Sequence, residues 1–414
     1  MPLMVHCDEI QPGMRLAEAF MFRGRMMLPG AKVLTREDVE VLQRKYPEVT
    51  LRIGDPLLDS VANFEDDSRE REVAQTAQQM VTQSLSKVQE RFGSNTALAS
   101  VNYNALKATA ASVIEYLSKN PVSAALLNRS TDNSDYLAEH SGNVFYLALV
   151  LGSAVRDYVV RERLRQTAAN HLTAAITMDL LPLGLGAMFM DTGMYALTHL
   201  FQEGYQLTDE DRQLLRQHPG AGSDLLPDTL PAGVKMVVRT HHENFDGSGY
   251  PAGMPGSEQH VFTRIIRICD AYEAATAQRI YAHAKSSARV LWEMCAGPYR
   301  HCYDPLLAKV FRGLIQPFPI GAKLKLSDGS TGVIVRYNRQ VPFEPQVIIA
   351  FDAAGERLAP ERLTPPFFVG ENNRLRLAEY DGEDLAYLYS SPLEAADAPP
   401  DRAVFNNLFD SCYP

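Results

Sequence analysis

Two adjacent histidines at the end of a short apolar helix constrain this chain more than any other sequence feature. His241 and His242 follow the run Val234–Val238, and each stands four residues after a valine of that run. Residues four apart share one helix face, so both imidazoles are predicted to point into the protein. The next segment, residues 243–251, contains two glycines and a proline, which favours a rigid loop whose backbone approaches a ligand closely. We interpret the two histidines as ligands.

Four further polar residues stand beside apolar segments of the same region. His140 shares a predicted helix face with three apolar residues, Asp191 follows a long apolar run, and Asp270 follows Ile-Ile-Arg-Ile-Cys. His218 belongs to a His-Pro-Gly sequence just past a predicted helix end. Three of these residues, taken alone, also fit a structural role. That role is a core histidine for His140, a cap or turn for Asp191, and a surface-loop histidine for His218.

Taken together, these four histidines and two aspartates predict a metal centre. Imidazole and carboxylate ligands suit Zn, Fe, Mn or Ni. An aspartate shared by two ions about 3.5–4 Å apart is a common feature of phosphoesterases, where the ions lower the pKa of bound water to roughly 7. The residues therefore point to phosphoester chemistry or to descent from it. A helical domain whose histidines only satisfy core hydrogen bonds is the structural alternative.

The hydrophobic pattern divides the chain into five predicted segments. Period-2 runs and turns predict small sheets near both ends, and 3.6-residue periodicity predicts helices between them. Cap patterns at Thr35–Asp38 and Thr208–Asp211 predict the starts of two helices. The helix of residues 64–95 has an apolar stripe, which fits either a dimerisation or signalling helix or a helix packed on its own domain. The segments are a small α+β module (1–62), a helical connector (63–124), a helical domain (125–315), a small β module (316–380) and a C-terminal tail (381–414).

Composition excludes several classes of protein. Hydrophobic residues make up 46% of the 414, which rules out wholesale disorder, and the net charge of −10 argues against a general binder of DNA or anionic membranes. The five cysteines form no CxxC pair, so neither a disulfide framework nor a cysteine-type zinc site is expected. The longest apolar runs, 144–155 and 180–190, are too short to span a bilayer. With no signal peptide visible, we expect a cytoplasmic protein.

The segment His241-His-Glu-Asn-Phe-Asp-Gly-Ser-Gly-Tyr-Pro251 resembles the signature of the HD-GYP domain family. The resemblance covers about residues 125–312, with His140, Asp191, His218 and Asp270 in matching order. It implies a mainly α, multidomain protein whose helical bundle is a metal-dependent phosphodiesterase for the bacterial second messenger cyclic di-GMP. It also implies one or two divalent transition-metal ions, with Asp191 as the bridging catalytic residue. The implied metal ligands are His140, Asp191, His218, His241, His242 and Asp270.

The same resemblance assigns the nucleotide contacts and exposes departures from the family pattern. The implied nucleotide-binding residues are Gly247, Gly249, Tyr250, Pro251 and Arg279. The histidine expected before Asp191 is Met190, the expected phosphate-binding lysine is Met194, and a basic residue expected shortly after Arg279 is Ala282. The interval between His140 and Asp191 is also longer than the resemblance implies.

These departures predict a signalling protein with a degenerate site and impaired turnover. The alternative is an active enzyme that hydrolyses cyclic di-GMP through a metal-bound hydroxide. The expected ligand is cyclic di-GMP or a related cyclic dinucleotide, and a signalling-protein partner and a homodimer are compatible with the sequence. The β module lacks the arginine-rich entry motif of a PilZ-type receptor ahead of Phe318, so we do not assign it that role.

Overall fold

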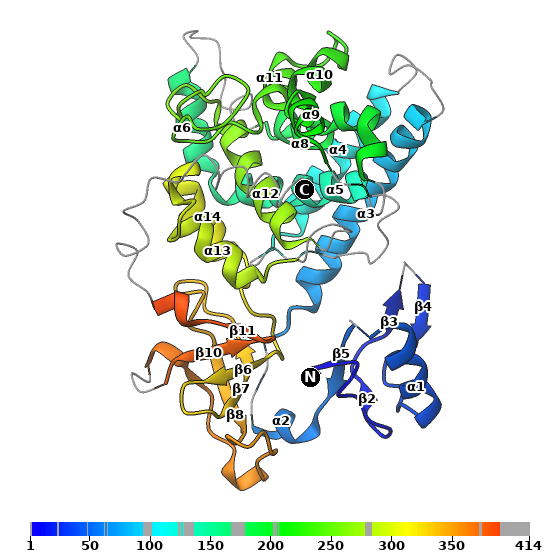
Figure 1. Ribbon diagram of the computed structural model, residues 1–414, viewed down its shortest axis with the longest axis vertical. Coiled ribbons are helices and arrows are strands. Elements are labelled where there is room, and N and C mark those ends of the chain that lie inside the picture. Colours follow the sequence, from blue (N-terminus) through cyan, green and yellow to red (C-terminus); the bar gives the residue numbers. More distant parts are fainter. Residues whose placement is uncertain are drawn as a thin grey trace. The chain divides into compact units, whose positions relative to one another are not determined.

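The structure is a computed structural model, and its described residues fall into two compact units. It describes residues 2–22, 25–47, 49–61, 63, 65–93, 102–122, 125, 127, 136–166, 179–201, 205, 207–277, 284–371 and 375–389. Residues 1–67 and 316–391 group together as one unit, here called the β-rich unit. Residues 68–315 group as the other, here called the helical unit. The fold is therefore mainly helical with small sheets near both ends of the chain, as the sequence predicts (Figure 1).

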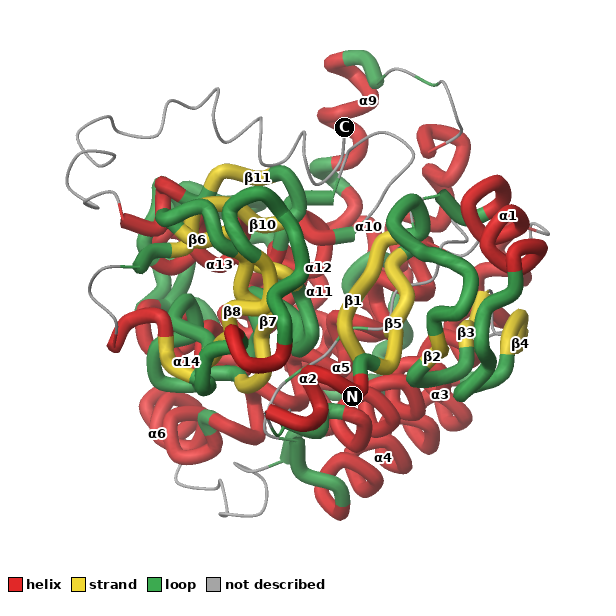
Figure 2. The backbone as a smooth tube through the Cα atoms, turned by 90° about the horizontal axis from the view of Figure 1, so that it is seen from below, coloured by secondary structure: helices red, strands yellow, loops and turns green. Residues whose placement is uncertain are grey.

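The N-terminal part of the β-rich unit contains two small antiparallel sheets and two helices. β1 and β5 run side by side in the first sheet, whose order is β1-β5-β2, and β3 pairs with β4 in the second (Figure 2). Helix α1 begins with a capping box between Thr35 and Asp38, as the sequence predicts. The bounds are β1 (Pro2–His6), β2 (Arg15–Leu16), β3 (Phe20–Phe22), β4 (Arg25–Leu28), α1 (Arg36–Lys45), β5 (Thr50–Gly54) and α2 (Pro56–Val61).

The C-terminal part of the same unit is an antiparallel sheet of order β11-β10-β6-β7-β8-β9. The turn Asp381-Gly382, with both residues at positive φ, joins β10 to β11 beyond the point where the tail is predicted to begin. The strands are β6 (Lys323–Leu326), β7 (Thr331–Arg336), β8 (Gln346–Phe351), β9 (Phe367–Phe368), β10 (Leu377–Tyr380) and β11 (Glu383–Asp384). Short 3-10 turns are η5 (Pro360–Arg362), η6 (Val369–Glu371) and η7 (Ala386–Tyr389).

Hydrogen bonds and ion pairs tie the two ends of the chain into this one unit. The Met4 amide donates to the Gly321 carbonyl at 2.9 Å, and the Glu65 amide donates to the Val335 carbonyl at 2.7 Å. Lys323 Nζ lies 2.7 Å from Glu9 Oε2. Segments more than 250 residues apart therefore share one folded body, which the sequence pattern alone treats as two separate modules.

The helical unit follows α3 through α14 and contains all the candidate ligands. Its capping box at Thr208 and Asp211 starts α9 as the sequence predicts. The first elements are α3 (Ser68–Gly93), α4 (Tyr103–Lys119), α5 (Tyr136–Ala154), α6 (Arg156–Gln166), α8 (Leu181–Phe189) and η3 (Thr192–Phe201). The remainder are α9 (Asp209–Leu215), α10 (His218–Leu225), α11 (Ala232–Thr240), α12 (Val261–Thr276), α13 (Ser287–Cys295), η4 (Arg300–Cys302) and α14 (Pro305–Leu314).

Helix α5 is the centre of this unit. Its residues from Leu137 to Gly152 are buried except Glu139, because α3, α8, α12 and α14 all pack against it. The sequence predicts one inward face here, whereas the structure covers the helix all round. Within the described part of the chain, no single helix is long and apolar enough to cross a membrane. Among the described helices, only α5 and α6 taken together, with a bend of 87° between them, reach that length and apolar character.

Helix α3 uses its apolar stripe within its own unit. The stripe packs on α5 and α4, and Gly142 of α5 allows the close approach, since a Cβ there would lie 2.5 Å from Thr82 Oγ1. Of the two interpretations that the sequence allows for this helix, the structure supports packing on its own domain. The stripe residues, all buried, are Val73, Ala74, Ala77, Val81, Leu85 and Val88.

Candidate metal centre

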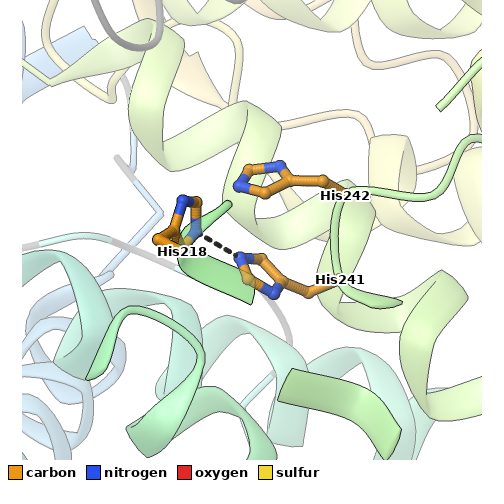
Figure 3. Close-up of side chains that lie close together, drawn as sticks. All are labelled: His218, His241 and His242. Atoms are coloured by element: carbon orange, nitrogen blue, oxygen red, sulfur yellow. Dashed lines mark hydrogen bonds between the residues drawn. The ribbon is translucent and has the colours of Figure 1, made fainter. Parts of the chain in front are cut away.

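Three buried histidines converge at the ends of two helices. His218 is the first residue of α10, His241 follows the last residue of α11, and His242 comes next along the chain. One ring nitrogen from each lies within 4.8 Å of the others, and the three side chains are at most 5% exposed (Figure 3). The sequence analysis treats His218 alone as a surface-loop histidine. The structure corrects this, because the residue opens a packed helix and is buried.

The hydrogen bonds of two of these rings determine where their lone pairs point. His218 Nδ1 lies 2.6 Å from the Leu215 carbonyl oxygen, and His241 Nδ1 lies 2.7 Å from the Val238 carbonyl oxygen. A carbonyl only accepts, so each Nδ1 carries a hydrogen, and in the neutral rings each Nε2 carries a lone pair. The two Nε2 atoms nevertheless face each other at 3.1 Å (Figure 3). Two facing acceptors repel unless a cation lies between them, so this pair fits a metal ion.

Asp191 faces the same point from the turn after α8. Its Oδ1 lies 3.4 Å from His218 Nε2 and 3.8 Å from His241 Nε2, and its Oδ2 lies 3.4 Å from His140 Nε2. The side chain is 1% exposed, and neither oxygen makes a hydrogen bond of normal geometry to the described residues. An unsatisfied buried carboxylate is costly unless it binds a cation. Asp191 therefore stands where one carboxylate can serve two sets of ligands.

The second set of side chains comes from α5 and α12. His140 Nε2 lies 3.2 Å from Asp270 Oδ1, and Asp270 Oδ2 lies 3.6 Å from His242 Nδ1. His140 and Asp270 are 1% and 2% exposed. The structure thus brings all six residues proposed as ligands together. Around Asp191, the first set supplies three imidazoles, whereas the second supplies one imidazole and one further carboxylate.

The loop after His242 folds back over that ring. The Tyr250 amide donates to the His242 carbonyl at 3.2 Å, and the two rings stack with centroids 4.8 Å apart. Gly249 permits this fold, because a Cβ there would lie 2.2 Å from the Asn244 nitrogen. Gly247 adopts a positive φ of 81°. The buried carboxylate of Glu243 holds the far side of the loop by accepting from the amides of Ala252 and Met254.

Comparison with known proteins agrees with this arrangement. A family model described as "HD domain" matches residues 155–307, a range that contains all the candidate ligands except His140. The protein named cyclic di-GMP phosphodiesterase PA4108 of Pseudomonas aeruginosa is 28% identical over 46% of this chain and 47% of its own length. The response regulator RpfG of Xanthomonas campestris, also named a cyclic di-GMP phosphodiesterase, is 29% identical over 31% of this chain and 35% of its own.

This chain contains an HD domain of the HD-GYP type. It spans about half or less of the length of these curated relatives. The 3'3'-cGAMP-specific phosphodiesterase 2 of Vibrio cholerae is 29% identical over 25% of this chain and 20% of its own length. A solved structure, the HDG"Y"P protein Bd1817 of Bdellovibrio bacteriovorus, covers 75% of this chain and 97% of its own at 14% identity, with a TM-score of 0.37.

The residues that depart from the HD-GYP pattern are placed as follows. Met190 and Met194 flank Asp191 and are fully buried. Arg279 and Ala282 lie outside the described residues. The long interval between His140 and Asp191 contains α6, which packs against α12 and α5.

Gly193 brings the turn carrying Asp191 against α10. A Cβ at this position would lie 2.3 Å from the His218 carbonyl oxygen and 2.9 Å from the Gly222 nitrogen. The backbones of η3 and α10 therefore touch where a side chain would hold them apart. This contact places Asp191 beside His218, and only glycine allows it.

Glu273 is a residue of the HD-GYP site that the sequence analysis missed. His140 Nδ1 donates to its Oε2, and Asn143 Nδ2 donates to its Oε1 at 2.9 Å. The bond from Nδ1 orients the opposite nitrogen of His140 toward Asp191 and Asp270, as carboxylates commonly do for metal-binding histidines. A signal was present in the sequence, because Glu273 is three residues after Asp270 on the same helix face.

Arg267, one turn before Asp270 on α12, also escaped the sequence analysis. Its Nη1 lies 3.5 Å from Asp270 Oδ2, and its Nε donates to Asn244 Oδ1 at 2.9 Å. The guanidinium thus joins α12 to the loop that begins at His242. It is 8% exposed and directed inward.

The electrostatics of the site separate its histidines. Burial, reinforced by the neighbouring His218, lowers the pKa of His241 to about 4, and burial with His241 beside it holds the pKa of His242 well below its usual value. Burial opposes charge on His140 too, but the carboxylates of Glu273, Asp270 and Asp191 raise its pKa to about 10. Metal binding requires neutral imidazole. His241 and His242 are therefore ready as ligands at neutral pH, whereas His140 must release a proton.

Replacing Glu273 with glutamine is expected to weaken metal binding at the second set of ligands, which contains His140, without unfolding the domain. A glutamine amide is uncharged and has one accepting oxygen for the two donors His140 Nδ1 and Asn143 Nδ2, so the support of His140 is weakened. Such outer partners typically contribute about 10–100-fold in metal affinity. The affinity can be measured by competition with a chelating dye, with thermal unfolding of the metal-free protein as the control. An unchanged metal affinity in a folded variant would show that Glu273 does not support the site.

Proposed function

We propose that the HD-GYP domain of this chain binds one divalent transition-metal ion and recognises cyclic di-GMP or a related cyclic dinucleotide, with impaired turnover. The observation that carries the proposal is the pair of Nε2 lone pairs of His218 and His241, 3.1 Å apart beside an unsatisfied buried Asp191. The ion that fits imidazole and carboxylate ligands is Fe, Mn, Zn or Ni. The ligand class comes from the relatives, which are named for acting on cyclic dinucleotides.

The two halves of the site support occupancy by one ion. His218, His241, His242 and Asp191 make a complete four-ligand set. The other half offers His140, Asp270 and the shared Asp191, and Met190 stands where the family places a further histidine. A thioether is a poor ligand for hard divalent ions. A second ion at that half would therefore bind weakly.

The surroundings of Asp191 also support impaired turnover. Met194, buried and uncharged, stands where the family has a lysine for phosphate. Each charge-assisted hydrogen bond that is lost costs about 1.5–3 kcal/mol. A dinucleotide carries two negative phosphates toward Asp191 and Asp270. Without the lysine at position 194, no charge from that position offsets the repulsion between these phosphates and the two carboxylates.

An active phosphodiesterase is the second candidate function, favoured by the names of the relatives. A divalent ion supplies Lewis acidity and a water of lowered pKa for attack on phosphorus. The chain's own residues would orient the reaction. Asp191 would hold the shared position, Glu273 would fix His140, and the loop Gly247–Pro251 would hold the dinucleotide.

Metal content and cleavage, measured on one sample, test both candidates. The full chain is purified without chelator, its metal per chain is determined, and cyclic di-GMP is incubated with it in the presence of Mn or Fe(II). We expect close to one ion per chain, binding of the dinucleotide and little cleavage. Two ions with sustained turnover would establish the active enzyme instead. No metal at any stoichiometry would overturn both candidates.

A further inference from the structure

A stack of three side chains leads outward from the metal centre. The His242 ring lies against Tyr250, with 21° between the ring planes, and the guanidinium of Arg216 lies over Tyr250 with its Cζ 4.8 Å from the ring centroid. Exposure rises along the stack. His242 is buried, Tyr250 is partly exposed, and Arg216 is exposed. The stack therefore runs from a buried candidate ligand to the protein surface.

The backbone fixes the position of Arg216 relative to the metal centre. Arg216 is the cap residue that ends α9, and its amide donates to the Arg212 carbonyl at 3.1 Å. Two residues later His218 opens α10 and presents its Nε2 to Asp191. A cation is thus attached to a candidate ligand through one short, hydrogen-bonded turn.

We infer that Arg216 binds a phosphate of the cyclic dinucleotide at the exposed end of this stack. The inference rests on the proposed function, and it supplies the cation that Met194 does not. The face of the guanidinium is used on Tyr250, whereas its N–H groups lie in its plane, the direction in which a phosphate accepts two parallel hydrogen bonds. Arg267, the other nearby described arginine, is directed inward to Asn244 and Asp270.

The stack also selects which phosphate Arg216 meets. Two stacking steps of 4.8 Å separate its guanidinium from the ring of His242. A phosphate seated on the metal would therefore lie deeper than Arg216 reaches. The second phosphate of a cyclic dinucleotide is the one left for the exposed end of the stack. Arg216 thus favours ligands with two phosphates over those with one.

The test compares Arg216→Gln and Arg216→Lys with a matched control in the full, metal-loaded chain. Arg161→Gln is the control, because Arg161 is also exposed and lies over a tyrosine ring, that of Tyr158, at 5.5 Å. Both glutamine variants lose one charge and one cation–π contact. Calorimetry gives the Kd for cyclic di-GMP and for GMP, a ligand with one phosphate, and metal content is measured on every sample.

We expect Arg216→Gln to weaken cyclic di-GMP binding about 10–100-fold, with metal content unchanged and GMP binding altered less than about twofold. Arg216→Lys should be intermediate, and Arg161→Gln should match the wild type. If the wild type binds and Arg216→Gln binds equally well or more tightly, the inference is wrong, and a base then takes the place of Arg216 on Tyr250. If the metal-loaded wild type binds no dinucleotide, the proposed function itself fails.

Discussion

Replacing Asp191 with asparagine is expected to empty the metal centre. Asparagine keeps the shape of the side chain but removes the charge that faces His218 and His140 at 3.4 Å each. An outer partner contributes about 10–100-fold in metal affinity. Because Asp191 belongs to both sets of ligands, its replacement should lower metal affinity by more than that. Metal per chain, measured after purification without chelator, should fall from close to one to near zero.

The control for this experiment is an aspartate outside the site. Asp228 is exposed and pairs with Lys235 at 2.6 Å, so Asp228→Asn makes the same chemical change and should leave metal content at the wild-type value. Circular dichroism of both variants establishes that they are folded. Wild-type metal content in Asp191→Asn would contradict the assignment of Asp191 as a shared ligand.

Introducing histidine at 190 and lysine at 194 together is expected to raise cleavage of cyclic di-GMP by about 100-fold or more. Met190→His adds an imidazole next to Asp191, for the half of the site whose only imidazole is that of His140. Met194→Lys adds a cation one turn away, since the Met194 amide donates to the Asp191 carbonyl at 2.8 Å. A lysine buried there requires a carboxylate partner, and Asp191, three residues earlier, is the candidate.

The single variants show how much of the gain in cleavage comes from the imidazole at 190 and how much from the cation at 194. Met190→His alone should raise metal content from about one toward two ions per chain, with a small gain in cleavage. Met194→Lys alone should leave metal content unchanged. Two ions without cleavage in the double variant would place the defect elsewhere in the site. Rapid cleavage by the wild type would contradict impaired turnover directly.

Local patterns predicted local structure well. The Thr35 and Thr208 capping boxes start helices where the sequence indicates, because a cap depends on residues three positions apart. His241, His242 and Asp270 are buried as their four-residue spacing from apolar side chains predicts. The burial of His218 was underestimated from the sequence. The chain turns directly from α9 into α10, and a His-Pro-Gly sequence is equally typical of a loop.

The residue types and their spacing determined by themselves that this chain has a helical domain with inward histidines and aspartates, and that the domain resembles the HD-GYP family. Only the tertiary structure decided that α5, α8, α10, α11 and α12 bring six of them to one point, with the Nε2 atoms of His218 and His241 facing each other. It also decided the positions of Glu273 and Arg216, and it joined the two ends of the chain in one unit. The physical reason is distance along the chain. Spacing reports which face of an element a residue occupies, but contacts between residues over 100 positions apart depend on how those faces pack.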